Sequence, residues 1–350
     1  MLHTLSVWRN GLAGLLAIAL CATAWSAQTL RVLAWPGYAD TDLVKVFEQR
    51  TGAKVELTFI DSDEALWQRI SSNKGQDFDV FAVNTAELQR YIDRAWVVPI
   101  DTSTMPNVAH QLPRFRNLQS IPGIQRGGKT FAVPYTYSEM GIIYDRQQVK
   151  EPPTSIRALW DPQYRGRVLL YNGGVHNFSF AAQSLKESSP FHLDEKAWEV
   201  AVNQLIELRR NALGFYTGPE ESVDLFRRKR AALMLANYGS QQLQLLKAAG
   251  VDVGYAIPQE GALAWLDCWV ITRGAKDTSL AAAWINYFLD SAPSEALISR
   301  QGLTNTTSPS PYLRAQDRLK WLEPVENVDR RNRLWERIMA GDRARKVLAP

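Results

Sequence analysis

The sequence predicts an α/β fold built as two lobes, each of them a β-sheet with helices packed on it. Three observations lead to this prediction. Short apolar stretches alternate with amphipathic helical stretches over the first hundred residues, a pattern typical of parallel sheets covered by helices. After a segment rich in Pro, Asn and Gln at 100–128, the alternation starts again. The length of 350 residues also exceeds that of an average domain.

The first unit is predicted as strands at 29–34, 55–60 and 78–83, with helices at about 41–50 and 61–73. A Pro-Gly turn follows the first strand, and Gly52 follows the first helix. In parallel sheets, ligands bind beyond the carboxyl ends of the strands. Side chains in such positions are Trp35 and Tyr38 after the first strand, and Asn84 and Thr85 after the third.

The second unit begins with strands at 130–135 and 142–144, joined by a crossing segment that carries Tyr137 and Glu139. A strand at 231–236 then leads into Tyr238. The remaining expected elements are strands at 167–171 and 254–257, helices at 198–210, 241–249 and 279–289, and a basic helix near the C-terminus.

A carboxylate between two indoles stands out in the run 260–269. Asp267 lies between Trp265 and Trp269 in a stretch that is otherwise typical of a buried strand. A buried carboxylate needs donors or a cation, because leaving it without a partner costs several kcal/mol. It can be a structural group that caps a turn beside core tryptophans, or it can bind a ligand ammonium that lies over Trp265.

The N-terminus predicts export. Residues 1–24 have the pattern of a signal peptide, with Arg9, an apolar stretch at 11–20 and a small-residue cleavage site at 22–24. The mature chain then retains one cysteine, Cys268, so no internal disulfide is expected. The net charge is +4, and its basic C-terminal residues are interleaved with acidic ones, which indicates a solvated helix and no nucleic-acid partner.

An enzyme is not expected. The histidines after the signal region are His110, His176 and His192, and they form no metal-binding pattern. No Gly-x-Ser-x-Gly or phosphate-binding loop motif is present. The sequence therefore predicts a binding protein without a metal or cofactor.

Several motifs resemble those of the periplasmic spermidine/putrescine-binding proteins, which are extracellular solute-binding proteins of ABC importers. The resemblance covers nearly the whole mature chain. The motifs, in order, are Ala34-Trp35-Pro36-Gly37-Tyr38, Asp77-Phe78-Asp79-Val80, Val133-Pro134-Tyr135, Gly141-Ile142-Ile143-Tyr144, Leu159-Trp160-Asp161-Pro162-Gln163-Tyr164-Arg165-Gly166-Arg167-Val168, Asn237-Tyr238-Gly239-Ser240 and Trp265-Leu266-Asp267.

The resemblance implies a two-lobed periplasmic binding protein fold, with hinge crossings near Pro134, Pro258 and Thr304 and a ligand cleft between the lobes. One lobe would combine 28–134 with 259–304, and the other 135–258 with 305–350. By the same resemblance, Trp35, Tyr38 and Trp265 stack on the ligand and Asp267 binds an amine.

The chain departs from the family pattern at four places. Gly173 to His176 stand where the family has an acidic pair, and Ala86 and Leu303 replace aromatics. Asn237 stands where a tryptophan is usual. Glu139 is a candidate second carboxylate because of its place in the crossing, although a purely structural role is equally open.

Two kinds of ligand are compatible with these residues. One is a di- or polyamine such as putrescine or spermidine. The other is a zwitterion such as an amino acid or aminophosphonate, with its acid group on the backbone N–H groups of the loop 172–177. The expected protein is periplasmic and monomeric, and its expected partner is the membrane permease of an ABC importer or a membrane sensor protein.

Overall fold

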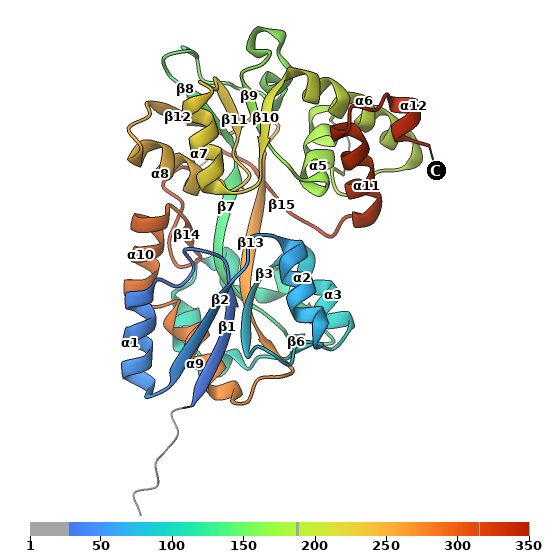
Figure 1. Cartoon of the computed structure of the whole chain (residues 1–350). Helices are drawn as coiled ribbons and strands as arrows, with labels where there is room; N and C mark the ends of the chain where they lie inside the picture. The colour runs from blue at the N-terminus through green and yellow to red at the C-terminus, as the bar shows by residue number, and fades with distance from the viewer. Residues whose placement is uncertain (1–27, 187–188, 315, 350) are drawn as a thin grey trace, which may run out of the picture.

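Two β-sheets form the cores of two lobes in the computed structural model, which describes residues 28–186, 189–314 and 316–349 (Figure 1). The predicted signal peptide lies outside the described residues. Among the described helices, none combines the length and the apolar character that crossing a bilayer requires. The expected α/β class and two-lobed arrangement are confirmed.

The lower sheet in Figure 1 has the strand order β14-β7-β13-β3-β1-β2, and β4 and β15 also pair with β13. The strands β1, β2 and β3 are parallel to one another, whereas β13 runs antiparallel to β3 and β7. The strands are β1 (Thr29–Ala34), β2 (Lys54–Phe59), β3 (Val80–Asn84), β4 (Val97–Val98), β7 (Val133–Met140), β13 (Ala262–Thr272), β14 (Thr304–Asn305) and β15 (Leu319–Trp321).

Helices cover both faces of this sheet. On one face, α1 (Thr41–Thr51) and α9 (Thr278–Tyr287) bury residues such as Phe47 and Trp284, whose rings meet edge to face. On the other, α2 (Asp63–Ser72) and α3 (Thr85–Asp93) bury their own apolar stripes. The lower lobe also contains α4 (Pro113–Arg116), α10 (Ser291–Gln301) and the hairpin of β5 (Gln125–Arg126) and β6 (Lys129–Thr130).

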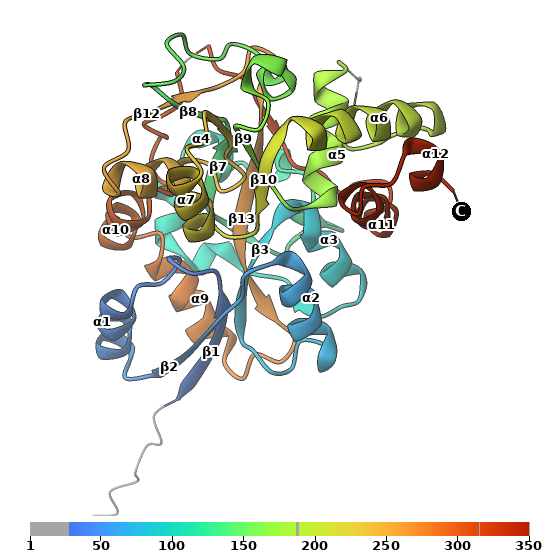
Figure 2. The same cartoon turned by 45° about the horizontal axis from the view of Figure 1, so that its top comes forward.

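The upper sheet has the order β10-β9-β11-β8-β12. Helices α5 and α6 lie on one face, and α7 and α8 on the other. The C-terminal helices α11 and α12 pack against α5 and α6 (Figure 2). These elements are β8 (Ile142–Asp145), β9 (Val168–Tyr171), β10 (Ala212–Tyr216), β11 (Leu233–Leu235), β12 (Val253–Ala256), α5 (Gly174–Ser184), α6 (Glu195–Asn211), α7 (Pro219–Arg228), α8 (Ser240–Ala248), α11 (Val328–Met339) and α12 (Ala344–Val347).

Two long strands, β7 and β13, run between the lobes (Figure 1). The sequence predicted a strand ending at Tyr135 and a separate crossing segment, and that prediction is wrong. Pairing with β13 keeps the backbone extended from Val133 to Met140, and β8 of the upper sheet starts at Ile142. Both strands are continuous through the region in which the resemblance places lobe boundaries, so the structure gives no sharp boundary there. The expected lobe boundaries stay a prediction.

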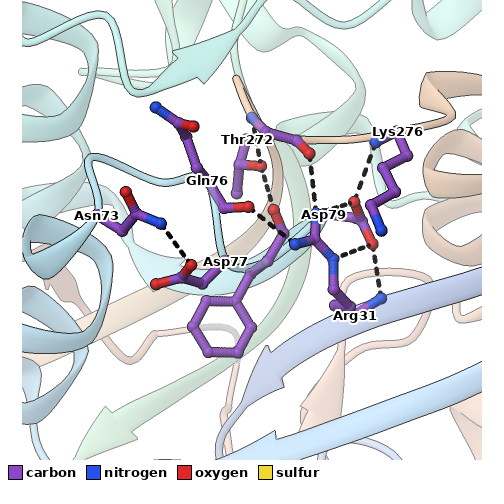
Figure 3. Close-up of polar contacts among 9 residues, drawn as sticks. Arg31, Asn73, Gln76, Asp77, Asp79, Thr272 and Lys276 are labelled. Atoms are coloured by element: carbon purple, nitrogen blue, oxygen red, sulfur yellow. Dashed lines mark hydrogen bonds and ion pairs between the residues drawn. The ribbon is translucent and has the colours of Figure 1, made fainter.

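An ion pair beside the start of β3 and the end of β13 holds β1, β3 and β13 together (Figure 3). Arg31 on β1 binds Asp79 through Nη2 at 2.6 Å and Nε at 3.1 Å, and its main-chain N–H donates to the same carboxylate. The main-chain N–H of Lys276, beyond β13, also donates to it at 3.1 Å. Burial alone would raise the pKa of Asp79, but these hydrogen bonds outweigh it and lower the pKa.

We expect the Asp79→Asn variant to lower the free energy of unfolding by about 2–4 kcal/mol at neutral pH, because Arg31 then loses its buried counter-charge. Chemical denaturation measures this loss. The native stability supplied by Asp79 is present above its unfolded pKa and disappears as the pH falls below about 4. The two proteins should therefore converge in acid.

The matched control is Asp252→Asn. Its carboxylate pairs with Arg146 at 3.1 Å, but both side chains are more than half exposed, so the expected loss is below about 1 kcal/mol. Equal losses in the two variants would contradict the structural role of the Arg31–Asp79 pair.

Candidate ligand-binding site

A cavity of about 430 Å³ lies where the two sheets face each other. The lower lobe contributes segments that follow β1, β2 and β3, and the upper lobe contributes segments that follow β9, β10 and β11. These are the carboxyl ends of parallel strands, where α/β sheets place their ligands. The start of α11 closes one side with Val328 and Asn332.

Asp267 lies on β13 at the floor of this cavity and is 6% exposed. Tyr38 Oη donates a hydrogen bond of 2.5 Å to Asp267 Oδ2, and Asn84 Nδ2 donates one of 3.2 Å to Oδ1. Register explains the second contact, since Asp267 stands opposite Asn84 in the β3–β13 pair. Each oxygen accepts one bond and keeps acceptor capacity for a ligand.

The Asp267 carboxyl has a raised pKa of about 6. Desolvation is the main cause, and the hydrogen bonds from Tyr38 and Asn84 offset part of it. Asp267 is therefore mostly ionised at neutral pH, but its charge is only partly compensated by neutral donors. A cation beside it would relieve this cost.

A β-bulge in β7 decides which side chains share the cavity with Asp267. The register against β13 shifts at this point, because Thr136 pairs with Asp267 while Cys268 pairs with Pro134. The extra residue, Tyr135, packs in the core on the side of Asp267 and donates to the main-chain oxygen of Tyr38 at 2.7 Å. Beyond the bulge the alternation is reversed, so Tyr137 packs in the core on the opposite face.

Aromatic rings line both sides of the cavity. Trp35, Tyr38 and Trp265 come from the lower lobe, and Tyr171 and Tyr238 come from the upper lobe. The ring centroids of Tyr171 and Tyr238 lie 6.0 Å apart in an edge-on arrangement. Trp265 Nε1 donates a 3.2 Å hydrogen bond to the main-chain oxygen of Asn237, which connects the two lobes at the cavity wall. Such ring faces attract cations.

The charged residues of the cavity are almost all acidic. Arg90 is the single lysine or arginine among the described residues that line it, and it forms a 2.8 Å ion pair with Glu87. Burial lowers the pKa of His176, so this side chain adds little positive charge at neutral pH. The lining carboxylates are Asp61, Asp63, Glu64, Glu87, Glu220, Asp267 and Glu323.

Asp63 is the lining carboxylate most affected by the others. It is the first residue of α2, and its pKa is raised by burial and then by the charges of Glu87 and Asp267, while Arg90 opposes this effect. Its charge also raises the pKa values of Tyr171 and Tyr238 in the upper lobe. Asp63 is thus electrostatically coupled to groups on both sides of the cavity.

The structure brings six of the nine predicted site residues together around the cavity: Trp35, Tyr38, Asn84, Tyr238, Trp265 and Asp267. Three others are not among the residues that line it. Thr85 is buried as the first residue of α3. Tyr137 and Glu139 lie beyond the bulge in β7, and Tyr137 Oη donates to the main-chain oxygen of Ser308 at 3.1 Å.

Sequence reasoning missed Asp63, Glu87 and Tyr171 as cavity residues. The rule that singled out Trp35 and Asn84 applies equally to the residues after β2 and to the last residue of β9, so Asp63 and Tyr171 could have been found. Glu87 could not, because its position depends on how α3 packs over the carboxyl end of β3.

Comparison with known proteins assigns the chain to a family. The family model described as bacterial extracellular solute-binding protein matches residues 42–313. The chain belongs to this family. The fold agrees with that of a spermidine/putrescine ABC transporter substrate-binding protein from Streptococcus pneumoniae, with a TM-score of 0.70 at 22% identity, covering 92% of this chain and 99% of that one.

Two characterised bacterial proteins are similar in sequence as well. The spermidine/putrescine-binding periplasmic protein of Escherichia coli is 25% identical over 279 residues, which cover 79% of this chain and 77% of that protein. The norspermidine sensor of Vibrio cholerae is 23% identical over 272 residues, which cover 75% and 71% of the two chains. The family resemblance expected from the motifs is confirmed.

The ligand-free Asp267→Asn variant should be as stable as the parent near pH 4 and should have an equal or higher melting temperature near pH 7.5. A carboxyl whose pKa is raised on folding destabilises the native state once the pH exceeds its unfolded value of about 3.9, and this penalty reaches its full size above about pH 6. Asn removes the charge and retains a hydrogen-bond acceptor. A thermal melt of the two proteins across this pH range measures the effect, and a large loss of stability at pH 7.5 would contradict it.

Proposed function

We propose that this protein captures a di- or polyamine between its two lobes and delivers it to the membrane permease of an ABC importer. The observation that carries the proposal is the buried Asp267 carboxylate, held by Tyr38 and Asn84 at the floor of an acidic cavity walled by aromatic rings. The polyamine-binding relatives support the choice of ligand class.

The chemistry of the cavity favours a ligand with more than one positive charge. A single ammonium on Asp267 would leave Asp63 with a pKa raised to about 8 by burial and by the charge of Glu87, with only Arg90 to favour its ionised form. A second ammonium near Asp63 would lower this pKa and pair with the ionised carboxylate. Asp63 is therefore the proposed second carboxylate for a ligand ammonium, in place of Glu139, which does not line the cavity.

The aromatic rings suit the carbon chain that separates two ammonium groups. Trp35 and Trp265 offer apolar faces to methylene groups and negative ring faces to the ammonium ends. Closure of the lobes would exclude water from the cavity, and charge pairs strengthen as the effective dielectric constant falls. Ligand capture would thus stabilise the closed form that a membrane partner recognises.

The location and partner belong to the same proposal. The predicted export signal and the periplasmic relatives favour a periplasmic receptor. That it acts as a monomer is part of the proposal. A relative in Vibrio cholerae is named a norspermidine sensor, so a membrane sensor protein is the second candidate partner.

A zwitterionic ligand is the second candidate, and one observation favours it. Helix α5 begins at Gly174 beside the cavity, and Gly173 to His176 line its wall. The first N–H groups of a helix have no partner within the helix and bind anions readily. An amino acid or aminophosphonate could place its amine on Asp267 and its acid group here.

A thermal-shift screen followed by titration calorimetry tests the proposed function. Putrescine and spermidine should raise the melting temperature, whereas glycine, glutamate and 2-aminoethylphosphonate should not. Asp267→Asn should weaken putrescine binding by about 30-fold or more, because it removes a buried counter-charge. Asp61→Asn, at the exposed rim of the cavity, is the matched control and should change the affinity by less than about threefold. Shifts obtained only with compounds that carry an acid group would replace the polyamine by the zwitterion.

The Asp63→Asn variant tests the second carboxylate. It should weaken putrescine binding by about tenfold but change the binding of butylamine, which has one ammonium group, by less than about threefold. Asp267→Asn should weaken both ligands. Calorimetry measures the four affinities, and an equal effect of Asp63→Asn on the monoamine and the diamine would contradict a position for the second ammonium near Asp63.

A further inference from the structure

Glu139 is a fully buried carboxyl group that the proposed capture of a ligand does not use. It lies near the end of the crossing strand β7, two residues before Gly141. Neither of its carboxyl oxygens has a hydrogen-bond partner among the described residues. An unpartnered ionised carboxylate in such a place costs several kcal/mol, so the group is strongly biased towards its neutral form.

The surroundings of Glu139 come from both lobes. Its main-chain oxygen accepts a 2.5 Å hydrogen bond from Tyr255 Oη on β12 of the upper sheet, and the same hydroxyl accepts one from Gly141 N. Ala264 of β13 stands opposite it in the lower sheet. The segment between β14 and β15 supplies the third side, through Ser310, Tyr312 and Asp317.

The charges around Glu139 do not favour its ionised form. The charge of Asp317 opposes the ionisation of Glu139, and the Asp317 carboxylate itself pairs with Arg314 at 3.1 Å. The ammonium of Lys247 on α8 lies over the ring of Tyr312, 5.4 Å from its centroid. Burial raises the pKa values of Tyr137, Tyr255 and Tyr312, so their hydroxyl groups stay neutral. Tyr137 lies on the same face of β7 as Glu139.

The pKa of Glu139 is consequently raised to about 7. Burial is the main cause, and the charge of Asp317 adds to it. The residue's own amide and the nearby Ser310 hydroxyl offset a part of the effect. A glutamate exposed to water has a pKa of about 4.3, so exposure of Glu139 would release a proton at neutral pH.

Exposure of Glu139 is tied to the hinge, because the elements that cover it belong to different parts of the molecule. The segment between β14 and β15 is anchored at both ends in the lower sheet, since β14 pairs with β7 and β15 pairs with β13, whereas β12 belongs to the upper sheet. Rotation of one lobe against the other must therefore move β12 and its Tyr255 relative to β13 and this segment. We propose that Glu139 is a proton-linked latch of the hinge: the neutral carboxyl stabilises the lobe arrangement of this structure, and its ionisation favours an arrangement in which water reaches β7.

The latch and the binding carboxylate respond to pH in opposite directions. Acidification protonates Asp267 and weakens its attraction for a cation, whereas it keeps Glu139 neutral and the hinge latched. Alkaline pH has the reverse effects. Substitution of Glu139 removes only the pH response of the hinge, and substitution of Asp267 removes only the pH response of cation binding, so the two can be measured separately.

Small-angle X-ray scattering of the ligand-free protein at about pH 5.5 and about pH 8.5 tests the latch. The radius of gyration of the parent should be larger at the higher pH, while Glu139→Gln should stay compact at both. The unfolding equilibrium constant of the parent, relative to that of Glu139→Gln, should also rise roughly 10- to 100-fold from pH 5 to pH 8, because a raised folded-state pKa costs stability above the unfolded value.

Two further variants keep the test decisive. Glu139→Met removes the charge with an apolar side chain of similar length, and it should behave like Glu139→Gln if that amide is poorly tolerated. Glu151→Gln, in an exposed loop, is the matched control and should retain the pH response of the parent. At about pH 5.5 the infrared difference spectrum of the parent minus Glu139→Gln should contain the carbonyl stretching band of one buried carboxylic acid, beside the bands that Asp63 and Asp267 give in both proteins.

An unchanged radius of the parent between the two pH values would overturn the proposal, and so would a change that persists in Glu139→Gln. No ligand takes part in these measurements. The latch can therefore fail while the proposed capture of an amine stands, and the reverse is equally true.

Discussion

The site depends on one carboxylate that remains charged in a place almost without water. Asp267 has only neutral donors, Tyr38 and Asn84, and both reach it from the carboxyl ends of neighbouring strands. The phenol of Tyr38 and the amide of Asn84 stabilise the negative charge of Asp267 without neutralising it. The site is consequently prepared for a cation, and the remaining lining carboxylates extend this preference over the whole cavity.

The two lobes contribute unequally to this preference. The lower lobe supplies Asp267 and the acidic start of α2, whereas the upper lobe supplies Tyr171, Tyr238 and the glycine-rich start of α5. In the proposed capture, a ligand would dock on the lower lobe by charge and be covered by the upper lobe through ring faces and backbone N–H groups. The cavity is acidic even though the stretch from Gly173 to His176 contributes no carboxylate to its wall.

Much of the lower lobe could be predicted from the sequence, because its first strands and helices follow local rules. The strand β1 has the predicted bounds, and α1 ends where Gly52 adopts a left-handed conformation with φ of +72°. The positions of Trp35 and Asn84 followed from the same alternation. Glu139 could not be placed in this way, because the bulge at Tyr135 reverses the side chains of β7 and has no local signature in the sequence. The pairing partner β13, more than a hundred residues later, creates it.

The path of the chain also determines when each sheet can be completed. All five strands of the upper sheet lie between Ile142 and Ala256, so this sheet can assemble from one continuous stretch. The lower sheet cannot, since β13 must insert between β3 and β7, and the contact of Asn84 with Asp267 spans 183 residues. Until β13 is available for pairing, β3 and β7 expose unpaired edges, which are prone to aggregation. The partly folded chain thus has a vulnerable interval in which chaperones would be most useful.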